Sequence, residues 1–279
     1  MTDDRIGFIG GGNMTQAIVA GLVSSGFRAA NILIAEPSAK QREVLTRTWP
    51  DAEIAPENIK IAARANCIVL AVKPQVLPTV CRDLANTAQQ TKPLIISIAA
   101  GIRSTDIDAW LGGGLAIVRA MPNQPALLQL GVTGSFANER VSAPQKQHAS
   151  KILAAVGKVV DVPHEADIDA VTAISGSGPA YFYLLIDMLT DTAQQLGLDK
   201  QVARILAIET ATGAAALAAQ SGDSMAELIA RVRSPGGTTA AALDSLDQQN
   251  VRDIFARALT AARDRATELA NDAHHKSKP

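Results

Sequence analysis

Short apolar runs alternate with helical stretches through the first half of the chain, and this alternation constrains the fold more than any other feature. Five runs have the β-branched, uninterrupted apolar character of buried strands: 5–10, 32–36, 67–72, 94–99 and 115–119. Strands separated by helices are joined by right-handed crossovers. The sequence therefore predicts an α/β fold with a doubly wound parallel sheet. Two further runs, 132–136 and 156–162, are candidate edge strands around a helix over about 144–155.

The pattern changes after about residue 167, where strand signals stop and apolar residues recur at helical spacing. Helices are predicted over 169–196, 200–219, 224–232 and 251–271. We therefore expect two domains, an α/β domain over residues 1–166 and an all-helical domain over 167–279. The tail from about Asp272 is polar, and we expect it to be disordered.

Charge and composition exclude several classes of partner. The chain has 26 Lys and Arg against 27 Asp and Glu, which leaves no positive excess for nucleic acid or an anionic membrane surface. Its longest apolar stretch, 93–102, is about half of a membrane span. The first five residues lack the layout of a signal peptide. Cys67 and Cys81 are too few for a disulfide framework and have no metal-ligand neighbours, so we expect a cytoplasmic protein without a metal.

A glycine-rich turn follows the first predicted strand and leads directly into a helix. This order of strand, turn and helix is the one that a dinucleotide-binding site requires. Gly10 permits the tight turn, and Gly12 lets a pyrophosphate approach the amides at the helix start. Thr15 stands where Gly or Ala is usual, which predicts slight crowding between helix and strand. The alternative is an ordinary glycine-rich turn between a strand and a helix.

An acidic residue ends the second predicted strand, roughly 20 residues beyond the turn. Glu36 at this place would accept a hydrogen bond from the adenosine ribose 2′-hydroxyl and repel a 2′-phosphate, which favours NAD. Ser38, Lys40 and Arg42 follow closely and offer groups that bind a phosphate, which favours NADP. The choice between NADH and NADPH stays open, as does the alternative that Glu36 is simply solvated.

Five further segments contain residue combinations that turns and caps alone do not explain. They are AVKP at 71–74, AAG at 99–101, RAMPNQP at 119–125, SGSGPAY at 175–181 and SPGGTT at 234–239. Together with FIGGGNM at 8–14, in this order and spacing, they closely resemble the Δ1-pyrroline-5-carboxylate reductases, the enzymes of the last step of proline biosynthesis. The resemblance extends over nearly the whole chain.

This resemblance implies a fold, a reaction and an assembly. It implies a Rossmann domain followed by a helical domain that forms a homodimer, often assembled further into decamers, with the active site where the domains meet. The reaction would be hydride transfer from NADPH or NADH to L-1-pyrroline-5-carboxylate, which gives L-proline. The implied cofactor-binding residues, to which Glu36 and Ser38 are added from the argument above, are Ile9, Gly10, Gly11, Gly12, Asn13, Met14, Asn58, Ala71, Val72, Lys73, Pro74, Ala99, Ala100, Gly101 and Asn123.

The segment 234–239 precedes a predicted helical run at 240–246, so it offers free amide groups and hydroxyls at a helix N-terminus. A substrate carboxylate suits such a place. The resemblance implies that Gly237, Thr238 and Thr239 hold the carboxylate and the ring-nitrogen side of the substrate. It also implies roles for Ser177 as a polar contact and for Glu165 near the bound amino acid. The alternative for the segment is a simple helix cap with Ser234 as the N-cap residue.

Two rival functions make different demands on the sequence. A β-hydroxyacid dehydrogenase would need a lysine in the first long helix of the second domain, and no Lys occurs between 169 and 198. A non-catalytic NAD(P)-sensing regulator would have no use for a carboxylate clamp at 234–239. The imine reductase itself needs little acid–base machinery, because the ring nitrogen becomes cationic on protonation. This agrees with four histidines that all lie outside the motifs.

Overall fold

The computed structural model describes residues 4–276, and its contacts divide the chain into two compact units. The first unit contains residues 1–177 and 262–279, and the second contains residues 178–261. The domain boundary that we placed after residue 166 stays a prediction, because it marks a change from strands to helices rather than a division by contacts.

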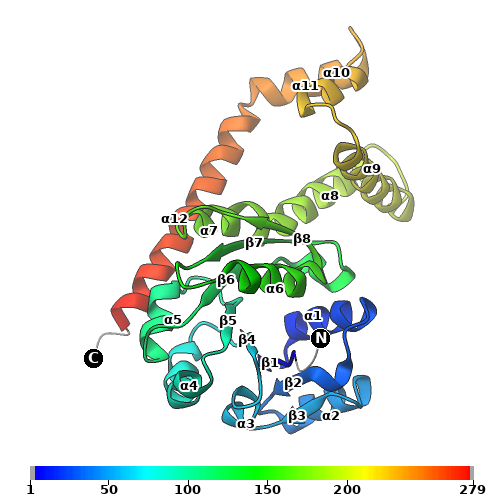
Figure 1. The fold of residues 1–279 in the computed structure, drawn as a ribbon. Helices are drawn as coiled ribbons and strands as arrows, with labels where there is room; N and C mark the ends of the chain where they lie inside the picture. The colour runs from blue at the N-terminus through cyan, green and yellow to red at the C-terminus, as the bar shows by residue number, and fades with distance from the viewer. Residues whose placement is uncertain (1–3, 277–279) are drawn as a thin grey trace. The chain divides into compact units, whose positions relative to one another are not determined.

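The first unit is built on one eight-stranded sheet in the order β3-β2-β1-β4-β5-β6-β7-β8 (Figure 1). The strands are β1 Ile6–Ile9, β2 Ile32–Ala35, β3 Glu53–Ala55, β4 Cys67–Leu70, β5 Leu94–Ser97, β6 Ile117–Met121, β7 Gly131–Ala137 and β8 Gly157–Asp161. The predicted doubly wound α/β fold is confirmed. Both candidate edge strands are present as β7 and β8, but only β8 lies at an edge, because β7 pairs with β6 on one side and β8 on the other. The three-residue β3 was not predicted, because it is too short to show an alternating pattern.

One pair of strands departs from the parallel arrangement. β6 and β7 are antiparallel, with Val118 opposite Ala137. The connection between them, 122–130, contains only a short 3-10 helix, η2 (Gln124–Leu128). A parallel pair needs a crossover of about a dozen residues or more, so this connection can only return the chain in the opposite direction.

Helices cover both faces of the sheet because successive residues of each strand point to opposite sides. On one face, Ile6 and Phe8 pack in one core cluster with residues of α1 (Asn13–Ser24) and α6 (Ala143–Ala154). On the other face, Ile9 packs in a second cluster. That cluster includes residues of α3 (Asn58–Ala62), α4 (Leu77–Thr91) and α5 (Ser104–Trp110). A further helix, α2 (Ala39–Thr48), contributes the buried Leu45 to the first cluster.

The chain after residue 166 is helical, as predicted. Its elements are α7 Asp167–Val171, a π-helical turn η3 Thr172–Gly176, α8 Gly178–Gln195, α9 Lys200–Gln220, α10 Met225–Val232, α11 Thr238–Gln248 and α12 Val251–Lys276. α12 continues as far as Lys276, and the expected disorder of the tail from Asp272 stays a prediction. Residues 272–276 contain neither Gly nor Pro, so nothing in them stops a helix. The rest of the predicted tail, 277–279, lies outside the described residues.

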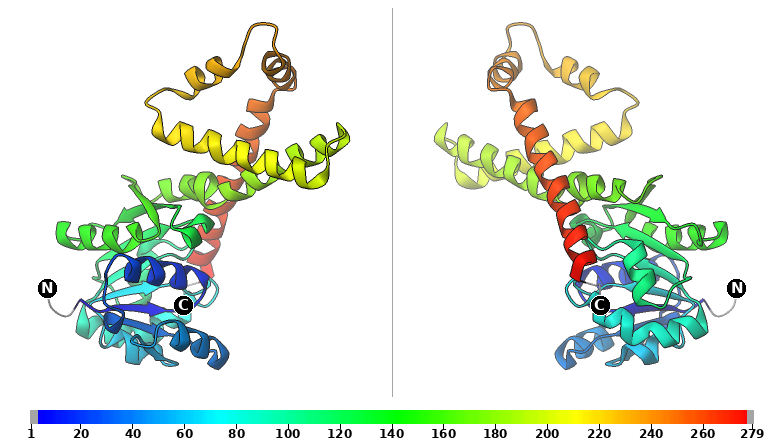
Figure 2. Two further views of the ribbon diagram at one scale, coloured as in Figure 1. Left: turned by 90° about the vertical axis from the view of Figure 1, so that its right-hand side faces the viewer. Right: turned by 90° about the vertical axis from the view of Figure 1, so that its left-hand side faces the viewer.

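The last helix belongs to both units, because residues from 262 onward count with the first. Thr267 Oγ1 donates to Asp169 Oδ2 at 3.1 Å, which joins the end of α12 to α7. Figure 2 shows this end of the chain in red. The helix therefore returns the chain from the second unit to the first.

The second unit exposes much of its apolar surface. Among its described residues only Gly178, Ala203 and Ala207 are buried, whereas Phe182 on α8 is 62% exposed and Leu206 on α9 is 52% exposed. Within residues 4–276, α9 is also the single helix long and apolar enough to cross a membrane by length and composition. Apolar surface on this scale marks a place where something else packs.

Candidate active site

The glycine-rich turn lies at the carboxyl end of β1, between β2 and β4. Gly10 N donates to Ala35 O at 2.9 Å, and Ala71 N donates to Ile9 O at 2.9 Å. Gly10 has a φ of +104°, and a Cβ at this position would lie 2.8 Å from Ala71 O. Only glycine allows this turn. The bond from Ala71 N places the start of the 71–74 segment beside it.

The backbone after this turn is open. Gly12 is the N-cap residue of α1, and no side chain donates or accepts a capping bond there. The position that a Gly12 Cβ would occupy has no heavy atom within 4 Å. The first amides of a helix have no acceptor within it and lie at the positive end of its dipole. The turn therefore combines unoccupied space with anion-binding amides, which fits a dinucleotide pyrophosphate.

Thr15 fits the turn instead of crowding it. Its side chain is fully buried, and its Oγ1 donates to Gly10 O at 2.6 Å. Gln41 from α2 reaches the same turn, because its Nε2 donates to Gly11 O at 2.9 Å. The sequence contained no signal for the Gln41 contact, which joins residues 30 positions apart.

Glu36 is held by the protein, so the alternative that it is simply solvated is wrong. Its Oε2 accepts from Gly11 N at 2.9 Å, and its Oε1 accepts from Ser38 N at 2.9 Å. Ser38 is in turn the N-cap residue of α2, since its Oγ accepts from Gln41 N at 3.4 Å. The carboxylate is thereby fixed next to the glycine-rich turn.

The other predicted cofactor-binding residues gather at the same edge of the sheet. Segment 71–74 follows β4, segment 99–101 follows β5, Asn58 begins α3 and Asn123 follows β6. In open parallel sheets, ligands bind at the carboxyl ends of the strands. A pocket of about 510 Å³ at this edge is lined by Pro74, Ala100 and Gly101 together with residues of α4 and the end of α12. The individual cofactor contacts stay predictions.

Asn123 connects two parts of the first unit. Its Oδ1 accepts from Val132 N at 2.9 Å, and its Nδ2 donates to Ser175 O at 3.1 Å in the π-helical turn. Ser177 follows this turn, and its backbone amide donates to Thr172 O at 2.8 Å. π-Helical turns occur frequently at functional sites. Both ends of the Asn123 amide are used within the protein, and its predicted place near the nicotinamide stays a prediction.

Glu165 is already occupied by protein donors. Its Oε1 accepts from Ser104 N at 2.6 Å, and its Oε2 accepts from Ser104 Oγ at 2.8 Å. Arg119 Nη1 lies 3.4 Å from the same Oε1. The carboxylate therefore joins the segment before α7 to the start of α5 and to β6. Its predicted role near the substrate stays a prediction.

Sequence reasoning missed the buried ion cluster around Arg119. This guanidinium, 1% exposed on β6, lies between Glu165 and Asp169, whose Oδ1 is 3.6 Å from Nη2. Arg103 Nη2 contacts the other oxygen of Asp169 at 2.8 Å. Burial lowers the pKa of Arg119, and the two carboxylates oppose this shift. The available signal was a charged residue inside an apolar strand pattern.

The 234–239 segment forms the start of α11 within the second unit. The helix begins at Thr238 with Gly237 as its N-cap residue, and no side chain caps it. Ser234 is therefore not the N-cap residue, so that alternative is wrong; instead Ser234 O accepts from Gly237 N at 3.0 Å. Gly236 has a φ of +70°, which makes the tight turn possible. The amides of Thr238 and Thr239 stand at the helix start, where a helix offers no internal acceptor.

Comparison with known proteins decides the family. A family model described as pyrroline-5-carboxylate reductase dimerisation matches residues 165–269, and one described as NADP oxidoreductase, coenzyme F420-dependent, matches residues 5–101. The pyrroline-5-carboxylate reductase of Pseudomonas aeruginosa is 44% identical over 97% of this chain and 98% of its own. The chain belongs to the pyrroline-5-carboxylate reductase family. The resemblance inferred from the six motifs is thereby confirmed.

Other relatives support this family membership over nearly the full length. The pyrroline-5-carboxylate reductase of Vibrio alginolyticus is 40% identical over 96% of this chain and 98% of its own. The structure of the Coxiella burnetii reductase superposes with a TM-score of 0.92 at 41% identity, covering 96% of this chain and 99% of that one. A Plasmodium falciparum reductase with NADP bound has a TM-score of 0.85 at 28% identity, covering 97% and 99%.

Family membership also accounts for the exposed apolar helices. The matched dimerisation region, 165–269, includes α8 and α9, and these helices bear the exposed Phe182 and Leu206. A second copy of the chain is the partner that this region takes in the family. The protein is therefore a homo-oligomeric oxidoreductase that uses NAD(P)H.

Proposed function

We propose that this chain reduces L-1-pyrroline-5-carboxylate to L-proline with NAD(P)H, the last step of proline biosynthesis. The observation that carries the proposal is the presence of two anion-binding helix starts, one in each unit, in a member of this family. One is the open turn at Gly12, and the other is the uncapped start of α11 at Thr238. The first suits a pyrophosphate and the second a carboxylate.

The reaction needs little acid–base catalysis by the protein. Protonation of the ring nitrogen gives an iminium ion, and its carbon accepts a hydride while the C=N π electrons become a lone pair on nitrogen. The nicotinamide, when bound, supplies that hydride. The residues of the chain then bind, orient and exclude water, and holding two reactants in place accounts for much of the rate enhancement in such a reaction.

The substrate-binding residues follow from the start of α11. We assign the carboxylate to the amides of Thr238 and Thr239, where the helix dipole favours negative charge. The Thr239 hydroxyl would face the ring-nitrogen side. Gly237 and Ser234 shape the turn, because Gly237 N donates to Ser234 O. Ser177 remains a candidate polar contact.

Glu165 has an indirect role in this proposal. Both of its oxygens accept from Ser104, so it has less capacity left for a ligand than a free carboxylate. It holds the start of α5 against β6 through Arg119. The loop after β6 contains Asn123, which we place beside the nicotinamide.

The assembly and location complete the proposal. The dimer would form through the helical region, which we delimit as residues 167–279 after a cofactor-binding domain of 1–166. We further propose that dimers assemble into a decamer and that the enzyme works in the cytoplasm. The apolar character of α9 then serves the contact between copies rather than a membrane.

A single assay tests the function. Purified protein is mixed with pyrroline-5-carboxylate and with NADH or NADPH, and both cofactor oxidation and proline formation are measured. Stoichiometric proline is expected with at least one cofactor. Cofactor binding without turnover would instead favour a sensing regulator, and turnover of a β-hydroxyacid alone would favour the dehydrogenase.

The Gly12→Val variant provides the structural control for that assay. Its side chain enters space that no protein atom occupies, so the fold should survive while the pyrophosphate loses its place. We expect unchanged thermal unfolding with weaker cofactor binding. Normal affinity in the folded variant would contradict the assignment of this turn.

A further inference from the structure

The buried carboxylate of Asp169 on α7 holds two segments that are far from it in the sequence. Its Oδ2 accepts from Arg103 Nη2 at 2.8 Å and from Thr267 Oγ1 at 3.1 Å. Arg103 is the N-cap residue of α5, and Thr267 lies near the end of α12. One oxygen atom therefore joins the start of α5 to the end of α12. All three residues belong to the sheet unit.

Both contacts act on the segment 99–101, which follows β5 and is predicted to bind the cofactor. Gly101 lies two residues before the bonded arginine, and its φ is +68°. A Cβ on Gly101 would lie 3.2 Å from the Cβ of Leu269, which is two residues after Thr267 on α12. Asp169 thus fixes the chain that leaves this segment and also the helix that packs directly against it.

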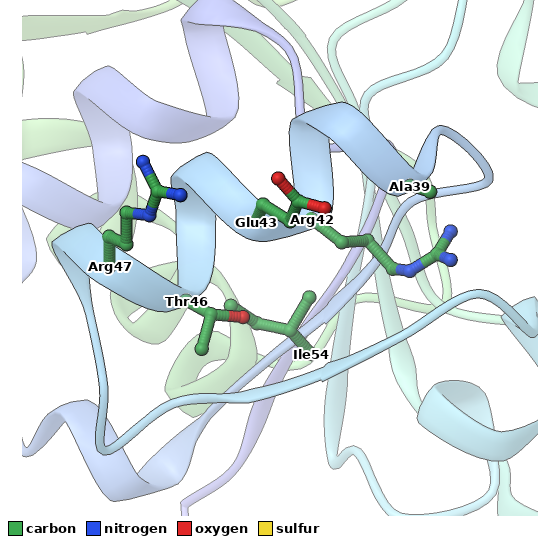
Figure 3. A pocket seen from close by; sticks show the side chains of 6 residues that line it. All are labelled: Ala39, Arg42, Glu43, Thr46, Arg47 and Ile54. Atoms are coloured by element: carbon green, nitrogen blue, oxygen red, sulfur yellow. The ribbon is translucent and has the colours of Figure 1, made fainter.

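The same end of α12 helps to form the pocket at this edge of the sheet. The residues that line its cavity of about 510 Å³ include Ala100 and Gly101 after β5 and Leu269 and Asp272 on α12. A second pocket, of about 420 Å³, is lined by residues of α2 and by Ile54 of β3 (Figure 3). A displacement of α12 would therefore change the first pocket and leave the second pocket as it is.

The two donors to Asp169 differ in what their removal would leave behind. Loss of Arg103 takes one guanidinium from a carboxylate that is 3% exposed, and breaking a buried ion pair lowers folding stability. Loss of the Thr267 hydroxyl leaves both guanidiniums in place, since Arg103 and Arg119 still contact Asp169. Thr267 is therefore the residue at which the link to α12 can be removed without leaving a buried charge unpaired.

We propose that Asp169 and Thr267 are positioning residues for the nicotinamide cofactor, because their hydrogen bond holds α12 against the segment 99–101. Neither residue touches the cofactor; they fix the backbone that does. A small displacement of a binding segment weakens binding and lowers the rate of a reaction that depends on orientation. The proposal rests on the reductase function proposed above and adds two residues that lie outside the predicted cofactor-binding set.

Two replacements of Thr267 test the hydrogen bond itself. Thr267→Val keeps a β-branched side chain and removes the donor, whereas Thr267→Ser removes a methyl group and keeps the donor. NADH and NADPH are titrated into each full-length variant, with nicotinamide fluorescence as the signal. For the cofactor that the unchanged protein binds more tightly, we expect Thr267→Val to raise the Kd by about three- to tenfold. Thr267→Ser should restore the Kd of the unchanged protein.

Kinetic constants separate positioning from a loss of stability. In Thr267→Val the KM for the cofactor should rise while the KM for pyrroline-5-carboxylate stays the same, because the start of α11 is unchanged. The matched control is Thr46→Val, the same replacement on α2, where Thr46 lines the pocket of Figure 3. It should change neither constant. A lower unfolding temperature with an unchanged Kd in Thr267→Val, or an equal rise in Thr46→Val, overturns the proposal.

Amide hydrogen exchange tests the link to α12 without any cofactor. In Thr267→Val the amides of residues 266–270 should exchange faster while those of α2 do not change, because a local release differs from global unfolding. Unchanged exchange at 266–270 overturns the proposal.

The reductase function and the positioning role fail in distinguishable ways. If the unchanged protein binds a cofactor but forms no proline, and Thr267→Val still weakens that binding, the function is wrong and the positioning role stands. If proline forms normally and Thr267→Val matches the unchanged protein in Kd and in exchange, the function stands and the positioning role is wrong.

Discussion

The two units of the chain bury their apolar residues in opposite ways. In the sheet unit, two clusters of buried side chains lie on the two faces of one sheet, and helices of the same chain cover both. In the helical unit, residues such as Phe182, Leu184 and Leu206 are more than half exposed. One unit completes its core within a single copy, and the other presents apolar faces that require a second copy.

This contrast separates the two tasks of the enzyme. The proposed cofactor site lies on the sheet unit, whose hydrophobic core is complete within one copy of the chain. The proposed substrate clamp at the start of α11 rests on helices whose burial depends on assembly. We therefore expect cofactor binding to tolerate loss of the dimer and substrate turnover not to tolerate it.

A charged residue on an exposed apolar helix should have the largest effect. Leu206 on α9 and Val160 on β8 are each 52% exposed, so they form a matched pair across the two units. Leu206→Asp would bury an unpaired charge in the dimer, which costs several kcal/mol and should dissociate it. Light scattering after gel filtration should report monomers for Leu206→Asp and dimers or larger assemblies for Val160→Asp. Assemblies that persist in the Leu206 variant would place the interface elsewhere.

Removal of the buried guanidinium should have the next largest effect, and it acts within the sheet unit. Arg119→Met leaves Glu165 and Asp169 without their buried partner, which should cost about 3–5 kcal/mol of folding stability. Urea denaturation followed by circular dichroism measures this loss. Arg47→Met on exposed α2 is the control and should cost little. A loss below about 1 kcal/mol for Arg119→Met would mean that Ser104 and Arg103, which already contact these carboxylates, satisfy them without the guanidinium.

Loss of the Thr239 hydroxyl should have an intermediate effect, confined to the helical unit. One hydrogen bond to a charged group contributes about 1.5–3 kcal/mol, so Thr239→Ala should lower kcat/KM for the imine roughly 10- to 150-fold. Cofactor affinity should not change, and α11 should stay folded because Gly237 is its N-cap residue. Ser245→Ala on the same helix serves as the control. Full activity of the Thr239 variant would show that the clamp is misplaced.

The smallest effect comes from a pair of helix caps, one in each unit. Ser142 caps α6 and Ser224 caps α10, each in a reciprocal capping box. Replacement by Ala should cost about 1 kcal/mol at either site. We expect Ser142→Ala to destabilise the sheet core and Ser224→Ala to weaken dimerisation as well, because the helical unit is stabilised by its partner. A dimer dissociation constant that rises equally in both variants would remove the distinction between the units.

Much of this protein is determined by local sequence. Strands such as 6–9 and 67–70 are recognisable because a short apolar run with β-branched residues is typical of a buried strand. The turn at Gly10 follows from the need for a positive φ, and the start of α11 follows from Pro235 and the two glycines before a helical run. The six motifs together were sufficient to predict the family.

The tertiary structure alone decided the contacts between distant residues. Glu36 reaches Gly11 across 25 positions, and Glu165 reaches Ser104 across 61. The antiparallel β6–β7 pair and the three-residue β3 likewise depend on which strand lies next to which. Local sequence sets the period and the turns of the backbone, whereas a hydrogen bond between distant residues forms only after packing has brought them within about 3 Å. For that reason the cofactor turn and the acidic residue near it could be predicted from the sequence, whereas the hydrogen bonds that hold the Glu36 carboxylate against the turn could be seen only in the fold.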